Sequence, residues 1–305
     1  MYLDQKRKFL LKEIDNFEKF FQEWNKEGWQ GIDLFSRFKR NLLRFAYSPF
    51  STFFFLIFRL FPIKKKIKIL KIRDIVLKGG NSSSSMLYFG FIIDSNELKL
   101  TKFLIKNLKP EDVFYDIGAN LGYYTYLALE FCKEVHSFEP IKECIESLRL
   151  NLKDKNNVFI NEVALSDKEG IIKLYVPGDL YGLSSIKSNI LHFKNLTTKE
   201  IPSITLDKYI YEEKHNPPTF LKIDVEGAEF EVLKGAEKFF KNNSPMISLE
   251  VWGKDNNGEI SMRAVNLLRD WGYKSYFITK DGELEQKEGD LSLITNGFDN
   301  FIFLK

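Results

Sequence analysis

The sequence predicts an α/β fold in which helices flank a mostly parallel sheet, and two observations support this. From residue 98 to the C-terminus, short apolar runs alternate with segments of helical periodicity, which is typical of such sheets. Two of these runs end in an acidic residue, Asp116 and Asp224, and a glycine follows each acid closely. Because ligands bind at the carboxyl ends of the strands in this fold class, we expect the functional site there.

The elements of this domain are expected in the following order. A helix carrying Leu100, Leu104 and Leu108 on one face ends before Pro110. The predicted strands are 113–115, 135–138, 158–164, 220–223, 246–251, 273–278 and the last residues of the chain. The other predicted helices are 123–131, a helix that begins at Pro140, 230–240 and 262–271. The segment between Val176 and Thr205 is expected to be a loop-rich insertion.

The first 80 residues have a different composition and are expected to form a helical, aromatic and basic extension. Leu10, Ile14, Phe17, Phe21 and Trp24 recur at helical spacing, and a second such pattern covers 35–45. The net charge is only +3, but 37–73 contains eleven lysines and arginines and no acid. A serine-rich loop begins at residue 81. We therefore predict two domains, 1–80 and 81–305.

The apolar run between Pro49 and Pro62 is too short to span a membrane, which takes about 20 apolar residues. Two alternatives remain for 37–73: peripheral contact with an anionic membrane, or a cap on the catalytic domain. A nucleic-acid partner is disfavoured because consecutive phenylalanines interrupt the basic residues. The N-terminus lacks the pattern of a secretory signal, and Cys132 and Cys144 are expected to be buried structural thiols. The predicted location is cytoplasmic, with possible membrane association.

The turn after the first predicted strand indicates which ligand binds. Gly118 and Gly122 bracket a strand-to-helix turn, but Asn120 replaces the middle glycine of the dinucleotide-binding pattern. Asp116 lies where a pyrophosphate would have to bind, so a ligand with positive charge, such as the sulfonium of S-adenosylmethionine, suits this turn better. Glu139 ends the second strand and is expected to accept hydrogen bonds from both hydroxyls of an unphosphorylated ribose.

A third signal is the sequence L-K-I-D-V-E-G-A-E, residues 221–229. Asp224 and Glu226 lie at the carboxyl end of a strand, where they can bind the acceptor, orient the methionine part of the cofactor, or act as a general base. Glu250 ends the next strand and can join them. His192, in the predicted insertion, is an alternative base. No metal-ligand spacing is visible, so we expect a metal-free mechanism, although Asp224 and Glu226 could hold one divalent ion.

The motifs D-I-G-A-N-L-G (116–122), S-F-E-P (137–140) and I-D-V-E-G-A-E (223–229) together resemble the FkbM-type methyltransferases. The resemblance covers roughly 98–304 and implies a class I methyltransferase (Rossmann-like) fold of seven strands, the last of them antiparallel, with S-adenosyl-L-methionine as cofactor. It implies cofactor contacts by Asp116, Gly118, Asn120, Gly122 and Glu139. A-L-S-D-K-E-G (164–170) resembles the family's third-strand end, which places Ala164 near the adenine.

The expected function is therefore S-adenosylmethionine-dependent methylation of a hydroxyl, with Asp224 and Glu226 as catalytic residues. The favoured acceptor is a sugar or a glycan or glycolipid precursor, and a non-sugar secondary metabolite is the alternative. A nicotinamide-dependent oxidoreductase is disfavoured by Asp116 and the missing glycine, and a binding module without catalytic activity is disfavoured by the acids at three strand ends. No pattern in the sequence identifies the individual acceptor or the oligomeric state.

Overall fold

The computed structural model describes residues 2–29, 57–58, 60–79, 84, 87, 90–92, 94–178, 184–187, 196–254 and 258–305. The chain forms two compact units, Met1–Ile93 and Asp94–Lys305. The boundary predicted from the sequence, near Asn81, lies earlier in the chain.

The first unit contains the long helix α1 (Tyr2–Trp29) and a β-hairpin. Leu10 and Ile14 are fully buried, as expected from the helical stripe that contains them. In the hairpin, β1 (Lys64–Ile69) pairs antiparallel with β2 (Arg73–Lys78). The extension is therefore not entirely helical. Burial alternates along part of each strand, with Ile67 and Ile69 buried in β1 and Ile75 and Leu77 buried in β2, as expected for period two. The predicted helix 35–45 lies outside the described residues.

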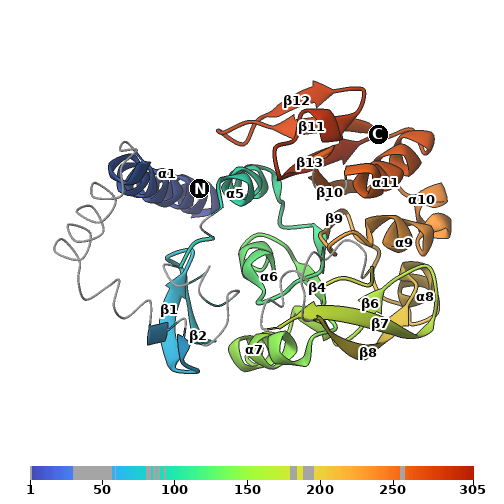
Figure 1. Ribbon diagram of the computed structural model, residues 1–305, viewed down its shortest axis with the longest axis horizontal. Helices are drawn as coiled ribbons and strands as arrows, with labels where there is room; N and C mark the ends of the chain where they lie inside the picture. Colours follow the sequence, from blue (N-terminus) through green and yellow to red (C-terminus); the bar gives the residue numbers. More distant parts are fainter. Residues whose placement is uncertain are drawn as a thin grey trace. The chain divides into compact units, whose positions relative to one another are not determined.

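The second unit is organised by an eight-stranded sheet with the order β12-β11-β13-β10-β9-β3-β4-β5 (Figure 1). Neighbours from β5 through β10 are parallel, and β13 runs antiparallel to both β10 and β11. This confirms the predicted α/β, Rossmann-like architecture, in which the sheet is mostly parallel and the last strand of the chain is antiparallel. The strands of this sheet are β3 (Val113–Ile117), β4 (Glu134–Phe138), β5 (Val158–Asn161), β9 (Phe220–Ile223), β10 (Met246–Trp252), β11 (Lys274–Ile278), β12 (Leu284–Lys287) and β13 (Phe298–Leu304).

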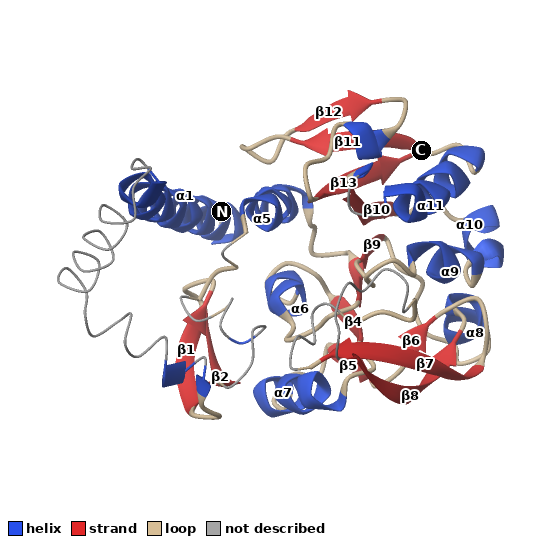
Figure 2. Cartoon of the chain, viewed as in Figure 1, coloured by secondary structure: helices blue, strands red, loops and turns tan. Residues whose placement is uncertain are grey.

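Helices cover both faces of this sheet (Figure 2). On one face lie α5 (Ser95–Asn107), α6 (Tyr123–Ala128) and α7 (Lys142–Leu152). On the other lie α8 (Leu206–Tyr211), α9 (Glu229–Lys234), α10 (Glu237–Asn242) and α11 (Gly258–Asp270). A short 3-10 helix, η4 (Leu291–Leu293), precedes β13. Both cysteines are buried and free, in agreement with the prediction of structural thiols.

Four expectations for single elements are corrected. The run 158–164 is two strands, because β5 ends at Asn161 and β6 (Ala164–Leu165) belongs to another sheet. That sheet, β6-β8-β7, contains β7 (Gly170–Pro177) and β8 (Leu196–Ile204), so the insertion expected to be loop-rich is partly strand. The helix 230–240 is broken at Gly235, where a Cβ would lie 2.0 Å from the carbonyl oxygen of Ser166. The sheet has an eighth strand, β12, because 279–283 forms a tight hairpin turn.

The central strands of the sheet are buried on both faces. Every residue of β3 and of β9 is buried, as expected for strands with helices on both sides. Asp116 in β3 and Lys222 in β9 are the charged residues within these two strands, and neither is more than 2% exposed. Burying a charge is costly unless it is paired. We therefore expect charged partners for these two residues at the strand ends beside them.

Candidate active site

A pocket lies at the carboxyl ends of β3, β4 and β9. Strands β7 and β8 contribute Leu174 and Ile201 to its wall. The other lining residues are Ile117, Gly118, Asn120, Phe138, Glu139, Pro140, Ile141, Val163, Ala164, Leu165, Ser184, Ile186, Asp224, Val225, Glu226 and Ala228.

The turn after β3 brings the backbone close to neighbouring strand ends. The amides of Gly118 and Ala119 both donate to the carbonyl oxygen of Phe138, at 3.0 and 3.1 Å. Gly118 has φ +82°, and a Cβ there would lie 1.8 Å from the carbonyl oxygen of Asp224. Asn120 also has a positive φ, +49°. Glycine is therefore required at 118 both by conformation and by the close approach of β9.

Glu139 is held at the pocket wall by two backbone groups. Its Oε2 accepts from the amide of Asn120 at 2.8 Å, and its Oε1 accepts from the amide of Ile141 at 2.9 Å. Each carboxylate oxygen keeps a further lone pair with which it can accept from a ligand hydroxyl. Burial raises the pKa of Glu139 to about 7, against the two amide hydrogen bonds that lower it.

Asp116 and Gly122 lie beneath the turn and are not among the described residues that line the pocket. The Asp116 carboxylate accepts from the Thr125 hydroxyl at 2.6 Å through Oδ2, and its Oδ1 lies 3.9 Å from Lys222 Nζ. Burial raises the pKa of Asp116. Gly122 begins α6 with φ +87°, and a Cβ there would lie 2.3 Å from Leu148 Cδ2. Both residues therefore support the turn: Asp116 through its contacts with Thr125 and Lys222, and Gly122 by allowing the close approach of Leu148.

The second signature follows β9. Asp224 and Glu226 line the pocket and are half-buried. Lys222 donates to Asp224 Oδ2 at 2.8 Å, and the Ser185 hydroxyl donates to the Glu226 carbonyl at 2.6 Å. Glu226 has φ +51°, a strained conformation for a residue with a side chain, and such strain often occurs at functional sites. Burial, with the nearby Asp224 charge, raises the pKa of Glu226 well above its ordinary value.

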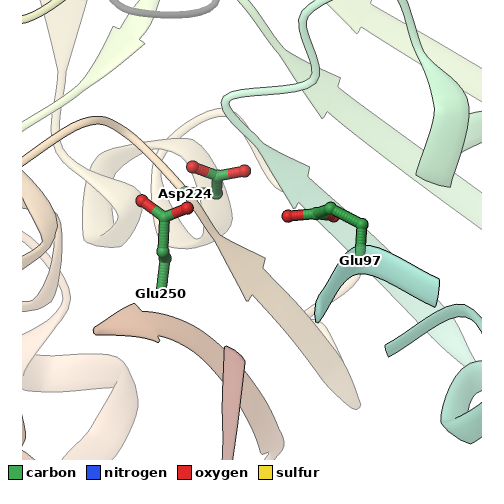
Figure 3. A group of neighbouring side chains, drawn as sticks. All are labelled: Glu97, Asp224 and Glu250. Atoms are coloured by element: carbon green, nitrogen blue, oxygen red, sulfur yellow. The ribbon is translucent and has the colours of Figure 1, made fainter. Parts of the chain in front are cut away.

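Three carboxylates converge beside the pocket: Glu97 of α5, Asp224 after β9 and Glu250 of β10 (Figure 3). One oxygen from each lies within 4.8 Å of the others. Burial raises the pKa of Glu97 to about 7 and that of Glu250 well above its ordinary value, and in both cases the Asp224 charge adds to the effect. Asp224 belongs to both the pocket and this group, so the two features adjoin.

Glu97 and Lys222 were not predicted as site residues from the sequence, although signals for both exist. Glu97 precedes Leu100 by three residues, so it continues the buried stripe of its helix as a carboxylate. Lys222 interrupts an apolar strand. In each case the pattern of apolar residues predicts a buried side chain at that position, and the residue there is charged. Such a residue indicates a candidate site, because a buried charge needs a partner or a ligand. His192, the alternative base, lies outside the described residues.

The family profile described as "Methyltransferase FkbM domain" matches residues 116–275. This segment contains all three motifs on which the resemblance rests. Among curated proteins, the chain is 27% identical over 141 residues to the hexuronic acid methyltransferase AglP of Haloferax volcanii, covering 46% of this chain and 56% of AglP. The chain thus spans about half the length of that relative.

Solved structures of methyltransferases are also similar to the chain. One is a methyltransferase FkbM from Methylobacillus flagellatus, with 15% identity, coverage of 73% of this chain and 54% of the other, and a TM-score of 0.40. The second is an O-methyltransferase from Bacillus cereus in complex with SAH, with 14% identity, coverage of 68% of this chain and 80% of the other, and a TM-score of 0.39.

Proposed function

The chain belongs to the FkbM methyltransferase family, whose members use S-adenosylmethionine, and we propose that it transfers the methyl group of this cofactor to a hydroxyl of a sugar or glycan precursor. One observation carries the proposal. The pocket wall presents the carboxylates of Glu139, Asp224 and Glu226, and no lysine or arginine is among the described residues that line it. A cationic sulfonium ligand suits such a wall, whereas the pyrophosphate of a nicotinamide cofactor would be repelled.

The residues of the pocket fit the parts of this cofactor. Glu139 retains lone pairs for the two ribose hydroxyls, because each of its oxygens accepts only one backbone hydrogen bond. Apolar side chains from three elements offer a surface for an adenine ring: Ile141, Leu165 and Leu174. Ala164 lies in the same wall, so its predicted place near the adenine is compatible with the pocket. We propose that Gly118 and Asn120 carry the backbone that approaches the cofactor, with Asp116 and Gly122 supporting the turn beneath.

Bound adenosylmethionine supplies an electrophilic methyl group, so the protein has to position the acceptor and remove its proton. We assign the general base to Glu226, because its half-buried carboxylate lines the pocket and makes no hydrogen bond that the structure shows. Asp224 is engaged by the Lys222 ammonium and is assigned to hold the acceptor or the methionine ammonium. The strained backbone of Glu226, tied to Ser185, fixes the base relative to the pocket.

A sugar acceptor is supported by the similarity to a hexuronic acid methyltransferase. The carboxylates around the site favour a neutral hydroxyl over an anionic carboxylate as the methyl acceptor, because an unneutralised anion would be repelled. Methylation of a hydroxyl gives an ether, and methylation of a carboxylate gives a methyl ester. The two products can be distinguished, because an ether withstands mild alkali and a methyl ester does not.

The experiment is methyl transfer from isotopically labelled adenosylmethionine to fractionated sugar nucleotides, lipid-linked sugars and free hexuronic acids. The proposal predicts label in a sugar-containing fraction that survives mild alkali. Label lost in alkali would replace the hydroxyl by a carboxylate as acceptor. Transfer only to fractions without sugar would contradict the acceptor class and leave methyl transfer itself standing.

A second proposal concerns peripheral contact with an anionic membrane, expected from the sequence for 37–73. No helix in the described ranges is long and apolar enough to cross a bilayer. Leu60, Phe61 and Ile63 are exposed, and Lys64, Lys66 and Lys68 project from one face of the hairpin that follows. Apolar residues beside lysines suit a charged lipid surface, at about 1 kcal/mol per lysine.

Co-sedimentation with phosphatidylserine vesicles tests this contact. We expect replacement of Lys64, Lys66 and Lys68 by glutamine to reduce binding. The same replacement of the exposed Lys153, Lys155 and Lys168 is the control. Equal partitioning of both variants and the original chain would overturn the membrane proposal.

A further inference from the structure

The carboxylates of Glu97, Asp224 and Glu250 come from three different elements that the fold holds in place. Helix α5 is fixed against β13, because Asn96 donates to the Phe298 carbonyl at 2.7 Å and Lys99 pairs with Asp299 at 2.8 Å. This attachment aims Glu97 toward Asp224 and Glu250 (Figure 3). Glu97 and Glu250 are each 6% exposed, so water screens their mutual repulsion poorly.

The protein's own groups neutralise this cluster only in part. Lys222 forms an ion pair with Asp224, but in the described part of the chain no ion pair reaches Glu97 or Glu250. Neutral donors are present: the Tyr124 hydroxyl and the Asn300 amide donate to Glu97, and the Trp252 indole donates to Glu250 Oε2 at 2.7 Å. Like charges this close and this well buried persist only when a cation or a proton compensates them.

A second observation, independent of the acids, points to a ligand here. Asn300 is 1% exposed, and its Oδ1 is buried without a hydrogen-bond partner. Asn300 lies directly opposite Glu250 in the β10–β13 register, so the two side chains project from the same face of the sheet. Its Nδ2 donates to Glu97 Oε1 at 3.3 Å, which places the carboxamide at the edge of the carboxylate cluster. A buried carbonyl oxygen without a donor is costly, and a bound cation would satisfy it.

We propose that Glu97, Asp224, Glu250 and Asn300 bind one divalent metal ion. Carboxylate and carboxamide oxygens are the ligands that hard divalent cations take. Two ligands of one ion are separated by at most twice the metal–oxygen distance, which is about 4.6–5.2 Å for Ca²⁺ and about 4.2 Å for Mg²⁺. The three carboxylate oxygens lie within 4.8 Å of one another, which is compatible with the ligand separations around one divalent ion. The metal-free mechanism expected from the sequence is replaced by this proposal.

The position of the ion has a consequence for the acceptor. Asp224 lies in both the cluster and the pocket wall, so the ion lies beside the pocket. Four side chains leave coordination positions of a six- to eight-coordinate ion open to water or to two oxygens of the acceptor. This consequence rests on the proposed methyltransferase function, and it favours acceptors with adjacent oxygens, such as a sugar diol. Binding of the ion itself does not depend on that function.

The first test is Tb³⁺ luminescence of the full chain, because Trp252 donates to the proposed ligand Glu250 and can sensitise a bound lanthanide. We expect saturable luminescence that Ca²⁺ or Mn²⁺ displaces. Asn300→Ala and Glu97→Gln should weaken binding by about 10- to 100-fold or more. Glu134→Gln is the control, since this partly buried glutamate makes hydrogen bonds at the opposite end of the sheet. Luminescence that does not saturate, or variants that bind like the original chain, would overturn the proposal.

Thermal unfolding gives a second measurement that does not depend on luminescence. The chain without metal should be stabilised by adding Ca²⁺ or Mn²⁺ after EDTA treatment, because the ion binds only the folded state. Glu97→Gln should be more stable than the original chain in EDTA, since one buried charge is removed, and should respond less to the metal. A metal response equal to that of the original chain would count against the site.

Different results would contradict the metal site and the proposed methyltransferase function. Calorimetry with S-adenosylhomocysteine on the same samples reports the cofactor pocket alone. Cofactor binding without metal binding would overturn the ion and leave the methyltransferase proposal intact. Metal binding that disappears in the Glu97 and Asn300 variants, with no cofactor binding, would support the ion and contradict the proposed function.

Discussion

Lys222 and Asp224 form an ion pair of 2.8 Å at the junction of the cofactor pocket and the carboxylate cluster. The Lys222 ammonium also lies 3.9 Å from Asp116 and 4.9 Å from the centre of the Tyr124 ring. Burial disfavours the charged lysine, but the negative charges of Asp224, Asp116 and Glu97 outweigh this and raise its pKa. One buried cation thus links the two glycine-containing signatures of the sequence.

We predict that Lys222→Met destabilises the protein by about 3–5 kcal/mol, because it leaves Asp116 and Asp224 without their buried partner. Urea unfolding followed by circular dichroism measures the free energy of unfolding. Lys234→Met is the control, since Lys234 forms an exposed pair with Glu237 whose loss should cost about 1 kcal/mol or less. Equal effects of the two substitutions would show that Lys222 does not compensate the buried acids.

Gly118→Ala is predicted to destabilise the protein and to abolish cofactor binding, because the new Cβ would lie 1.8 Å from the Asp224 carbonyl oxygen. Gly289→Ala separates this clash from backbone strain, since Gly289 has φ +77° with nothing within 4 Å of the added carbon. The control should lose only about 1–2 kcal/mol from its left-handed backbone. Thermal unfolding and calorimetry with S-adenosylhomocysteine measure both effects, and a Gly118 variant that behaves like the control would contradict the close approach.

Glu139→Gln is predicted to weaken binding of S-adenosylhomocysteine by about 10- to 100-fold, because a charge-assisted hydrogen bond contributes about 1.5–3 kcal/mol. The substitution replaces one carboxylate oxygen by an amide that cannot accept from a ribose hydroxyl. Glu143→Gln is the control on the neighbouring helix, where Glu143 pairs with Lys199 at the surface. Unchanged affinity in the Glu139 variant would remove this residue from the cofactor site.

Cofactor affinity is predicted to depend on pH through Glu139, whose pKa is about 7. The ionised carboxylate accepts two ribose hydroxyls, and protonation removes an acceptor site. Affinity for S-adenosylhomocysteine should therefore fall as the pH is lowered through 7, by up to about tenfold per pH unit. Calorimetry between pH 6 and 8.5 measures this. The Glu139→Gln variant should show a flat profile over the same range, and the same slope in both proteins would assign the titration to another group.

Glu226→Gln is predicted to lower the rate of methyl transfer by about 10²–10⁴-fold with little change in affinity for S-adenosylhomocysteine, as expected for loss of a general base. Asp224→Asn should also lower turnover and should raise the KM for the acceptor, because Asp224 is assigned to binding. Glu162→Gln, at an exposed pair with Arg149, is the matched control. If both site variants kept full turnover, neither residue could be the base.

The sequence was sufficient to predict the sheet and the strand-end turns, because their signals are local. Apolar runs bounded by Asp116 and Asp224 predicted β3 and β9, and glycines at 118 and 122 predicted the turn that the structure requires to be tight. Element ends were less predictable. The break at Gly235 depends on the approach of the Ser166 carbonyl, which is 69 residues away along the chain.

The carboxylate cluster depends on long-range pairing and therefore could not be read from local patterns. Glu97 approaches Asn300 only because α5 packs on β13, and Glu250 faces Asn300 only because β13 is antiparallel to β10. Asp116 was predicted as a cofactor contact from its place in the motif. In the structure its carboxylate instead contacts Thr125 and Lys222 below the turn, and these contacts depend on how the chain folds around β3. Motif position indicated the region of each residue but not the direction of its side chain.

Isothermal titration calorimetry of the full chain with S-adenosylhomocysteine and with NADH, in parallel, tests the central claim most directly. If the carboxylate-lined pocket holds an unphosphorylated ribose and a cationic methyl donor, the demethylated cofactor should bind saturably at one site and NADH should not bind. Binding of NADH, or no binding of S-adenosylhomocysteine, would contradict the account of the pocket.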